Sequence, residues 1–319
     1  MNRQLPGARD DAAIDGASID TNALHALRVA LIGYGEVGGI IGRALRKHSL
    51  ASIRAYDRLF DDPVHGDAVK QRALDDGVVA AISADAAVGD ADIVFSAVTA
   101  AETAAAVRAA APGLCKGAFY IDMNSASPQA KRHGAETINA AGGRYVEMAV
   151  MASVPPYGVA VPMLSGGPHA AAVAPLLAML GFNVKPASDA YGVASAIKMC
   201  RSVIVKGMEA IVIESFLTAR HYGVEDQVLP SLAETFPGLN WEKTGDYFFQ
   251  RVAAHGKRRA EEMCEAAVTV REAGLDPLMA SAIAERQGWL AGLIAGRGAA
   301  AAPAGAHWRE WADWITSHE

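Results

Sequence analysis

The stretch that decides the fold is Arg28-Val29-Ala30-Leu31-Ile32-Gly33-Tyr34-Gly35-Glu36-Val37-Gly38. Its first five residues form a short apolar run typical of a buried parallel strand. The glycines that follow have the spacing GxGxxG, and residues 38–49 have the pattern of a helix. In this arrangement Gly33 makes the tight turn, Gly35 lets a pyrophosphate approach the backbone, and Gly38 lets helix and strand pack closely. The stretch predicts a dinucleotide-binding turn.

Asp57 strengthens this interpretation. It follows a second apolar run, residues 52–56, and lies 19 residues after Gly38. That spacing is typical of a carboxylate that accepts a hydrogen bond from the ribose 2′-hydroxyl. Because a carboxylate repels a 2′-phosphate, Asp57 favours NAD over NADP. Arg58 comes next and could pair with a phosphate, so NADP stays open as the less favoured cofactor.

Outward from the turn, short apolar runs alternate with Ala-rich helical stretches, as in βαβ units. We expect residues 27–190 to form a doubly wound α/β Rossmann domain. The expected strands are 28–32, 52–56, 92–98, 118–123, 144–150 and 161–166, and the expected helices include 100–112 and 127–142. Residues 1–26 are acidic and rich in small residues, and we expect them to form a flexible tail.

After Ala190 the alternation stops, and helical periodicity takes over. Residues 191–319 should form an all-helical substrate and dimerisation domain, with a flexible linker at 295–306. The expected helices are 192–222, 225–236, 246–273, 276–295 and 305–317. The first of these is apolar on most sides, which predicts a helix covered by a partner subunit in a homodimer. Trp308, Trp311 and Trp314 lie along one face of the last, which favours a packing role.

Composition excludes several classes. The chain has 319 residues, 51% of them hydrophobic, and a formal charge of −6 with no extended Lys/Arg run, so nucleic acid is not expected as a partner. Its three cysteines, Cys115, Cys200 and Cys264, are far apart, so we expect neither disulfides nor a metal site, and a cytoplasmic location. No apolar run is long enough to span a membrane.

Hydride transfer from an alcohol needs a side chain that accepts the hydroxyl proton, and Lys198 is the candidate base. It lies in Gly192-Val193-Ala194-Ser195-Ala196-Ile197-Lys198. This stretch resembles the G-x-G-x-x-x-K motif of the β-hydroxyacid dehydrogenase family, which includes 3-hydroxyisobutyrate and 6-phosphogluconate dehydrogenases, with Ala194 replacing the second glycine. Residues 122–128, Asp-Met-Asn-Ser-Ala-Ser-Pro, resemble the family's D-x-S-T-x-x-P segment, and the likeness spans roughly residues 27–215.

The resemblance implies roles for individual residues. Lys198 would be the general acid/base, and Asn124 and Ser125 would lie near the nicotinamide and the substrate. NAD would lie across the carboxyl ends of the strands. The full cofactor-binding set that we expect is Gly33, Tyr34, Gly35, Glu36, Val37, Gly38, Asp57, Arg58, Val98, Thr99 and Asn124.

The chain departs from the family where the substrate should bind. The segment D-A-P-V-S-G-G corresponds here to residues 147–153, Glu-Met-Ala-Val-Met-Ala-Ser, so the usual Ser and Gly pair is lost. Ser153 could supply a replacement hydroxyl, or it could belong to a loop stiffened by the prolines that follow. Four residues after Lys198 the family has Asn, and this chain has Ser202, preceded by Arg201. We expect substrate recognition to differ, and an aromatic or bulkier acid stays open.

Residues 251–263 resemble a less characterised helical domain that follows similar cofactor domains in some bacterial proteins. Arg251, His255, Arg258 and Arg259 fall roughly on one side of this helix and could grip a carboxylate or phosphate. Alternatively, Arg258 pairs with Glu262, and Arg259 with another acid. Lys206 lies two turns after Lys198 and either contributes to an anion site or pairs with Glu209.

Together these features favour an NAD(P)-dependent oxidoreductase that acts on the CH–OH group of a small-molecule hydroxy acid, with Lys198 as general acid/base. Ser125, Ser153, Arg201, Ser202 and His255 are the expected substrate contacts. Two alternatives stay open: an imine reductase on the same scaffold, which would generally carry Asp or Tyr at the position of Lys198, and a non-catalytic sensor of NAD(H).

Overall fold

The computed structural model describes residues 24–298, 302–303 and 307–317. The expected tail therefore lies almost wholly outside the described residues, as does much of the expected linker at 295–306. The chain forms two compact units. The first holds most of the chain up to Ser195, and the second holds the chain from Ala196 onward together with two short segments, Thr99–Ala101 and Ser125–Gln129.

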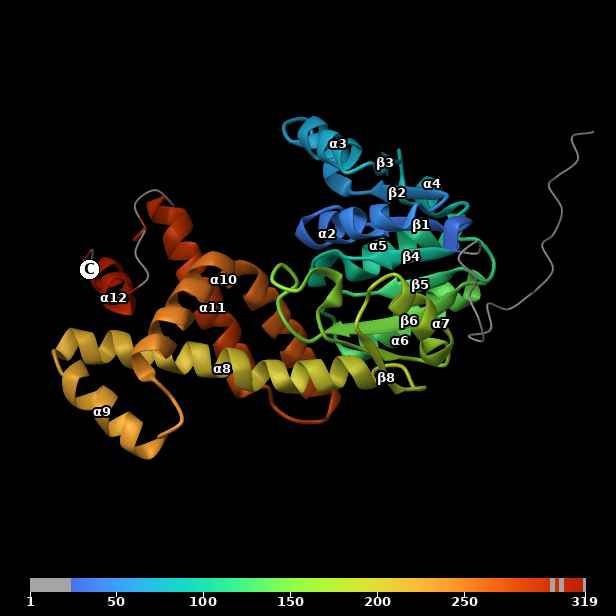
Figure 1. The fold of residues 1–319 in the computed structure, drawn as a ribbon. Coiled ribbons are helices and arrows are strands. Elements are labelled where there is room, and N and C mark those ends of the chain that lie inside the picture. Colours follow the sequence, from blue (N-terminus) through green and yellow to red (C-terminus); the bar gives the residue numbers. More distant parts are fainter. Residues whose placement is uncertain (1–23, 299–301, 304–306, 318–319) are drawn as a thin grey trace, which may run out of the picture. The chain divides into compact units, whose positions relative to one another are not determined.

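The first unit is built on an eight-stranded sheet of order β3-β2-β1-β4-β5-β6-β7-β8 (Figure 1). The strands are β1 (Arg28–Ile32), β2 (Ser52–Tyr56), β3 (Val79–Ala80), β4 (Ile93–Ser96), β5 (Phe119–Asp122), β6 (Arg144–Val150), β7 (Met163–Gly166) and β8 (Val184–Ser188). From β3 to β6 all neighbouring strands are parallel. The strand order reverses between β1 and β4, and such a reversal creates a crevice at the carboxyl ends of the strands.

One expectation about the sheet was wrong in detail. The run at 161–166 forms β7 only from Met163, and β7 pairs with β6 in the antiparallel direction. Two strands were also missed. β3 has only two residues, and β8 contains a lysine and a proline and is largely exposed, as an edge strand can be.

Alternate residues of the strands face two separate hydrophobic cores. Leu31 and Phe95 pack into the core covered by α2 (Glu36–Leu45) and α7 (Ala170–Met179). Ile32 and Val94 pack into the core covered by α4 (Ala84–Val88), α5 (Thr103–Ala110) and α6 (Pro128–Ala140). Helix α3 (Gly66–Asp75) follows β2. Helices on both faces of a mostly parallel sheet confirm the predicted doubly wound fold class.

The second unit is helical, as predicted. Its helices are α8 (Val193–Tyr222), whose first three residues belong to the first unit, α9 (Glu225–Thr235), α10 (Trp241–Glu272), α11 (Leu278–Arg297) and α12 (Trp308–Thr316). Helices α10 and α11 pack along each other. Helix α10 begins five residues before the predicted start because the Asn240 side chain accepts a hydrogen bond from the Lys243 amide, at 3.0 Å, and caps it. Trp308 and Trp311 are buried in the core of this unit.

Candidate functional site

The glycine turn between β1 and α2 has the shape that a dinucleotide needs. Gly33 has a φ of +95°, and a Cβ there would lie 2.5 Å from the Ala97 carbonyl oxygen. A Cβ on Gly38 would overlap the Gly33 carbonyl oxygen, so both glycines are required by the fold itself. A Cβ on Gly35 would meet no atom of the described chain within 4 Å. The free space at Gly35, at the N-terminus of α2, leaves room for a group such as a pyrophosphate to approach the backbone.

Asp57 lies at the carboxyl end of β2 and is tied to this turn. One carboxylate oxygen accepts a hydrogen bond from the Tyr34 amide at 2.6 Å, and the other accepts one from the Leu59 amide at 2.8 Å. The residue is half-buried, so the carboxylate remains partly exposed at the strand end. Asp57 therefore has a role that its spacing did not predict: it holds the glycine turn in place.

Tyr34 is less available to a cofactor than we expected. Its side chain is fully buried and its hydroxyl donates a hydrogen bond to Asp76 at 2.8 Å. Burial, with help from Asp76, raises the pKa of the Tyr34 phenol. The Tyr34 amide is already bonded to Asp57, and its carbonyl accepts a hydrogen bond from Arg72. Tyr34 therefore stabilises the glycine turn through its hydrogen bonds to Asp57, Asp76 and Arg72. Of its neighbours, Glu36 is exposed and Val37 packs against the core.

Arg58 is mostly exposed and forms an ion pair with Glu102, at 2.5 Å between Nη1 and Oε1. The guanidinium of Arg58, a cation that could hold a 2′-phosphate, is therefore paired with a carboxylate and follows Asp57 directly in the sequence.

Asn124 follows β5 and connects two strand ends. Its Oδ1 accepts a hydrogen bond from the Val98 amide at 2.7 Å, and its Nδ2 donates one to Ser96 Oγ at 3.0 Å. The side chain is buried, so Asn124 fixes the loops that follow β4 and β5 rather than offering its amide to a ligand. Val98 itself lies over Gly33. The remaining expected cofactor contact, Thr99, is exposed.

A buried ionic network that the sequence did not predict involves Asp122, at the end of β5. Asp122 is fully buried, pairs with the Lys131 ammonium at 2.9 Å, and accepts a hydrogen bond from the Tyr145 hydroxyl at 2.6 Å. Its Oδ1 also accepts from the Asn124 amide at 3.0 Å. An acid inside an apolar strand was the available signal, because a buried carboxylate must have partners.

Glu147 is a second buried carboxylate with a positioning role. It stands where the family has the first residue of its substrate segment, but its two oxygens accept hydrogen bonds from the amides of Gly192 and Ala194, each at 2.8 Å. The Ser195 hydroxyl adds a longer bond at 3.3 Å. Glu147 thus caps the N-terminus of α8 and fixes that end of the helix to β6.

Lys198 and Ser125 meet within the second unit. The Lys198 ammonium donates a hydrogen bond to Ser125 Oγ at 2.5 Å. The segment that holds Ser125 is in turn bound to α10, where Glu265 accepts from the Ser127 amide at 2.7 Å and Glu272 accepts from the Gln129 amide at 3.1 Å. Ser125 directly follows Asn124 in the sequence, so the hydroxyl that Lys198 contacts is one residue away from the side chain that fixes the loop after β5.

One turn beyond Lys198, α8 carries Ser202, and one turn further it carries Lys206; both are buried. Lys206 bonds to Ser202 Oγ at 3.4 Å and pairs with Glu262 of α10 at 2.7 Å between Nζ and Oε2. The partner of Lys206 is therefore Glu262, and not the Glu209 that the sequence suggested. Burial lowers the pKa of the Lys206 ammonium, and Glu262 only partly opposes this.

The expected arginine cluster on α10 does not form one open face. Arg259 is buried, and its guanidinium bonds to Glu209, with 3.0 Å between Nε and Oε2. Arg251 also approaches Glu209, at 3.8 Å. Arg258 is exposed and His255 is half-buried. The alternative in which Arg259 pairs with an acid is the correct one, because a buried guanidinium needs a counter-ion.

The other two expected substrate contacts are Arg201, which is exposed on α8, and Ser153, which is half-buried in the loop after β6. The backbone of this loop turns through hydrogen bonds from Tyr157 and Gly158 to the Val154 carbonyl. Among the described residues, no group of three or more His, Cys, Asp or Glu side chains is placed to hold a metal ion. No described helix meets the length and apolarity that a bilayer crossing requires.

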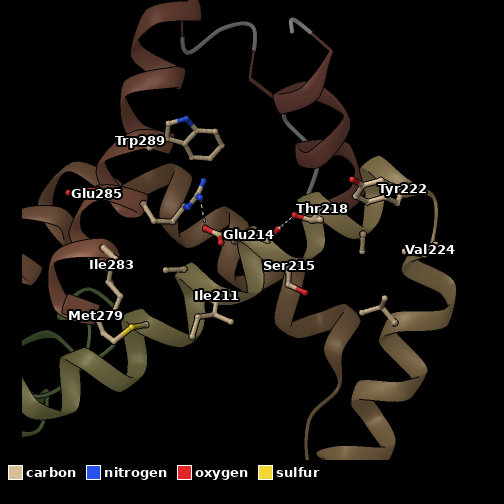
Figure 2. A pocket seen from close by; sticks show the side chains of 15 residues that line it. Ile211, Glu214, Ser215, Thr218, Tyr222, Val224, Met279, Ile283, Glu285 and Trp289 are labelled. Atoms are coloured by element: carbon tan, nitrogen blue, oxygen red, sulfur yellow. Dashed lines mark hydrogen bonds and ion pairs between the residues drawn. The ribbon is translucent and has the colours of Figure 1, made fainter.

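A separate apolar groove of about 1020 Å³ lies within the second unit, and Figure 2 shows Ile211, Met279 and Trp289 on its walls. Glu214, which pairs with Arg286, lies between them. The lining comes from α8, α9, α11 and Val224, and in the described chain it includes none of the predicted site residues.

Comparison with known proteins gives two family matches. Residues 28–200 match the family described as the NAD binding domain of 6-phosphogluconate dehydrogenase, and residues 219–290 match a family described as a domain of unknown function. Both agree with the resemblances inferred from the sequence.

Solved structures extend this result. A conserved hypothetical protein from Sinorhizobium meliloti 1021 is 37% identical, with 91% of this chain and 95% of that chain covered and a TM-score of 0.72. A 3-hydroxyisobutyrate dehydrogenase from Mycobacterium tuberculosis, solved with L-serine, is 16% identical, covers 92% of this chain and 100% of its own, and has a TM-score of 0.65. An imine reductase from Myxococcus stipitatus in complex with NADP⁺ is 16% identical over 85% and 95% of the two chains, with a TM-score of 0.52. The last two show a shared fold.

Proposed function

Because the chain belongs to the family of the NAD binding domain of 6-phosphogluconate dehydrogenase, we propose that it catalyses reversible, NAD-dependent oxidation of the alcohol of a hydroxy acid. The observation that carries this proposal is the hydrogen bond between Lys198 and Ser125. It joins an amine that can accept a proton to a hydroxyl that can orient a substrate oxygen. Ser125 directly follows Asn124, which fixes the loop after β4, and Lys198 lies in the first two turns of α8, whose N-terminus is capped by Glu147.

Each part of the chain has a defined task in the proposed reaction. Gly35 leaves room for the pyrophosphate, and Asp57 would accept a hydrogen bond from the ribose 2′-hydroxyl. When bound, the nicotinamide supplies the hydride acceptor. Lys198, as the neutral amine, takes the proton of the substrate hydroxyl, and Ser125 holds the same oxygen in line. In the reverse direction the Lys198 ammonium returns the proton to the carbonyl oxygen.

The Lys198–Ser125 pair also favours this reaction over imine reduction, since a lysine stands where imine reductases generally carry Asp or Tyr. A non-catalytic sensor would need the glycine turn but would have no use for a lysine and a serine held together. The alternatives nevertheless make different predictions for one experiment.

That experiment combines NADH binding, followed by fluorescence, with an NAD-dependent assay over a panel of hydroxy acids. We expect Lys198→Ala to bind NADH like the wild type. Its kcat should be about 10²–10⁴-fold lower with the hydroxy acid that the wild type oxidises. The matched control is Lys257→Ala, which removes an exposed lysine of α10 and should change neither quantity. Binding without turnover on any acid would instead favour a sensor, and turnover on cyclic imines alone would favour an imine reductase.

A further inference from the structure

The Glu262 carboxylate is the centre of an unusual charge arrangement. It lies 2.7 Å from the Lys206 ammonium and also interacts electrostatically with Lys198 and with Arg258, one turn away on α10. Burial alone would raise the pKa of the Glu262 carboxyl, but these three cations outweigh burial and lower it to about 2. Glu262 therefore forms a direct ion pair with Lys206 and also acts electrostatically on Lys198, the proposed base.

Three neighbouring charged groups, Glu209, Arg259 and Glu265, have hydrogen-bond partners of their own. Glu209 and Arg259 both act on Lys206, but they bond to each other. Glu265, the next acid along this part of α10, accepts a hydrogen bond from the Ser127 amide. Glu265 lies three residues after Glu262, and the Ser127 amide that it binds lies two residues after Ser125, which accepts a hydrogen bond from Lys198. The part of α10 that carries Glu262 is therefore close to Lys198 as well as to Lys206.

Resting on the proposed function, we propose that Glu262 is a positioning residue for Lys198 and that Lys206 regulates its effect. In oxidation, the substrate O–H bond breaks and a new N–H bond forms on Lys198, while the hydride and its electron pair leave carbon for the nicotinamide. The lysine becomes an ammonium, and the Glu262 carboxylate stabilises that charge. Lys206 competes for the same carboxylate and so weakens its effect on Lys198. This competition keeps part of Lys198 in the neutral form that can accept a proton.

This proposal predicts shifts of opposite sign for the two partners. Glu262→Gln removes the negative charge, which favours the neutral amine of Lys198, and should move the acid limb of the kcat/KM profile to lower pH by roughly one unit. Lys206→Met removes the competing cation, so Glu262 stabilises the ammonium form of Lys198 more strongly. The same limb of the kcat/KM profile should move to higher pH. Glu262→Asp, which keeps the charge, should stay close to the wild type. The matched control is Glu261→Gln, on the preceding residue of α10.

The proton equilibrium of Lys198 can also be measured without any substrate. Only a neutral amine reacts with acetic anhydride, so the pH dependence of Lys198 acetylation, read by peptide mass spectrometry in each variant, reports the same shifts. At a fixed pH on the rising limb, we expect about tenfold faster acetylation of Lys198 in Glu262→Gln and slower acetylation in Lys206→Met.

The two readouts separate the two proposals. If no hydroxy acid is oxidised but acetylation shifts with opposite signs, the proposed reaction fails and the coupling of Glu262 to Lys198 stands. If Glu262→Gln and Lys206→Met leave the acetylation profile in place, or move it in the same direction, Glu262 does not position Lys198 and has only a structural role. Circular dichroism of each variant shows whether it folds. If Lys206→Met does not fold, the acetylation profiles of Glu262→Gln and its control Glu261→Gln still test the proposal.

Discussion

Asp57 shows how one side chain combines a structural and a binding task. Its hydrogen bond to the Tyr34 amide holds the glycine turn, and its charge faces the position of the cofactor ribose in our proposal. Substitutions can separate the two tasks. Asparagine keeps one carbonyl oxygen that can accept from the Tyr34 amide, but it removes the charge and the acceptor of the Leu59 amide, whereas alanine removes the charge and both acceptors.

We expect Asp57→Asn to reduce the preference for NAD(H) over NADP(H) by about tenfold, since the repulsion of a 2′-phosphate disappears. Asp57→Ala should lower affinity for both cofactors, because the turn also loses its acceptor. Dissociation constants for NADH and NADPH, measured by fluorescence titration of each variant, check this. An unchanged ratio in Asp57→Asn would mean that the carboxylate does not reach the ribose.

At this scale the sequence did not predict which partners the charged side chains have. The spacing from Gly38 identified Asp57, but the bond to Tyr34 depends on how the turn is closed. Likewise, the sequence placed Lys206 within reach of Glu209 on the same helix. The actual partner, Glu262, is 56 positions away and comes close only because α10 packs beside α8.

The turn between β1 and α2 allows a test at the scale of an element. Gly35→Ala places a Cβ in open space, so we expect a thermal unfolding temperature close to that of the wild type and a loss of NADH binding, because the methyl group occupies the path of the pyrophosphate. Gly38→Ala should lower the unfolding temperature as well, since its Cβ overlaps the Gly33 carbonyl.

The matched control for this pair is Gly292→Ala, a glycine of α11 whose added Cβ also meets nothing within 4 Å in the described chain. It should change neither stability nor binding. Calorimetry and NADH titration of all three variants provide the comparison. If Gly35→Ala binds NADH like the control, the turn does not hold a pyrophosphate.

Elements with strong periodicity were predicted well, because local pattern determines them. β1, β2 and β6 have the predicted bounds, and α8 begins one residue after the predicted start and ends where expected. The direction of β7 could not be predicted in this way, since an apolar run is the same whether its neighbour is parallel or antiparallel. β3 and β8 lie at sheet edges and lack the apolar pattern that identifies a strand.

For the whole molecule, we propose that the partner surface is the α8 face of a second copy of this chain. Ile197, Ile204 and Ile211 are 42%, 70% and 55% exposed and recur every seven residues. Seven-residue spacing keeps apolar side chains on one helix face, and a two-fold dimer brings the same face of both copies together. Ile211 also lines the apolar groove, which extends this surface onto α11 (Figure 2).

We expect the protein to sediment as a dimer at micromolar concentration and Ile204→Asp to sediment as a monomer, because the charge would be buried against its copy. The matched control is Ile82→Asp, at an isoleucine of the first unit that is 88% exposed. Analytical ultracentrifugation of the three proteins checks this. A monomeric wild type, or a dimeric Ile204→Asp variant, would contradict the proposed surface.

In the proposed reaction this chain moves a hydride between a hydroxy acid and a nicotinamide cofactor, with Lys198 as the base. The most direct measurement uses a hydroxy acid from the panel that carries deuterium on its alcohol carbon, incubated with NAD and the wild-type protein, with mass spectrometry of the cofactor. We expect reduced cofactor that contains one deuterium, formed by the wild type and by Lys257→Ala and formed at least about a hundredfold more slowly by Lys198→Ala. Cofactor that binds but acquires no deuterium from any acid of the panel would contradict it.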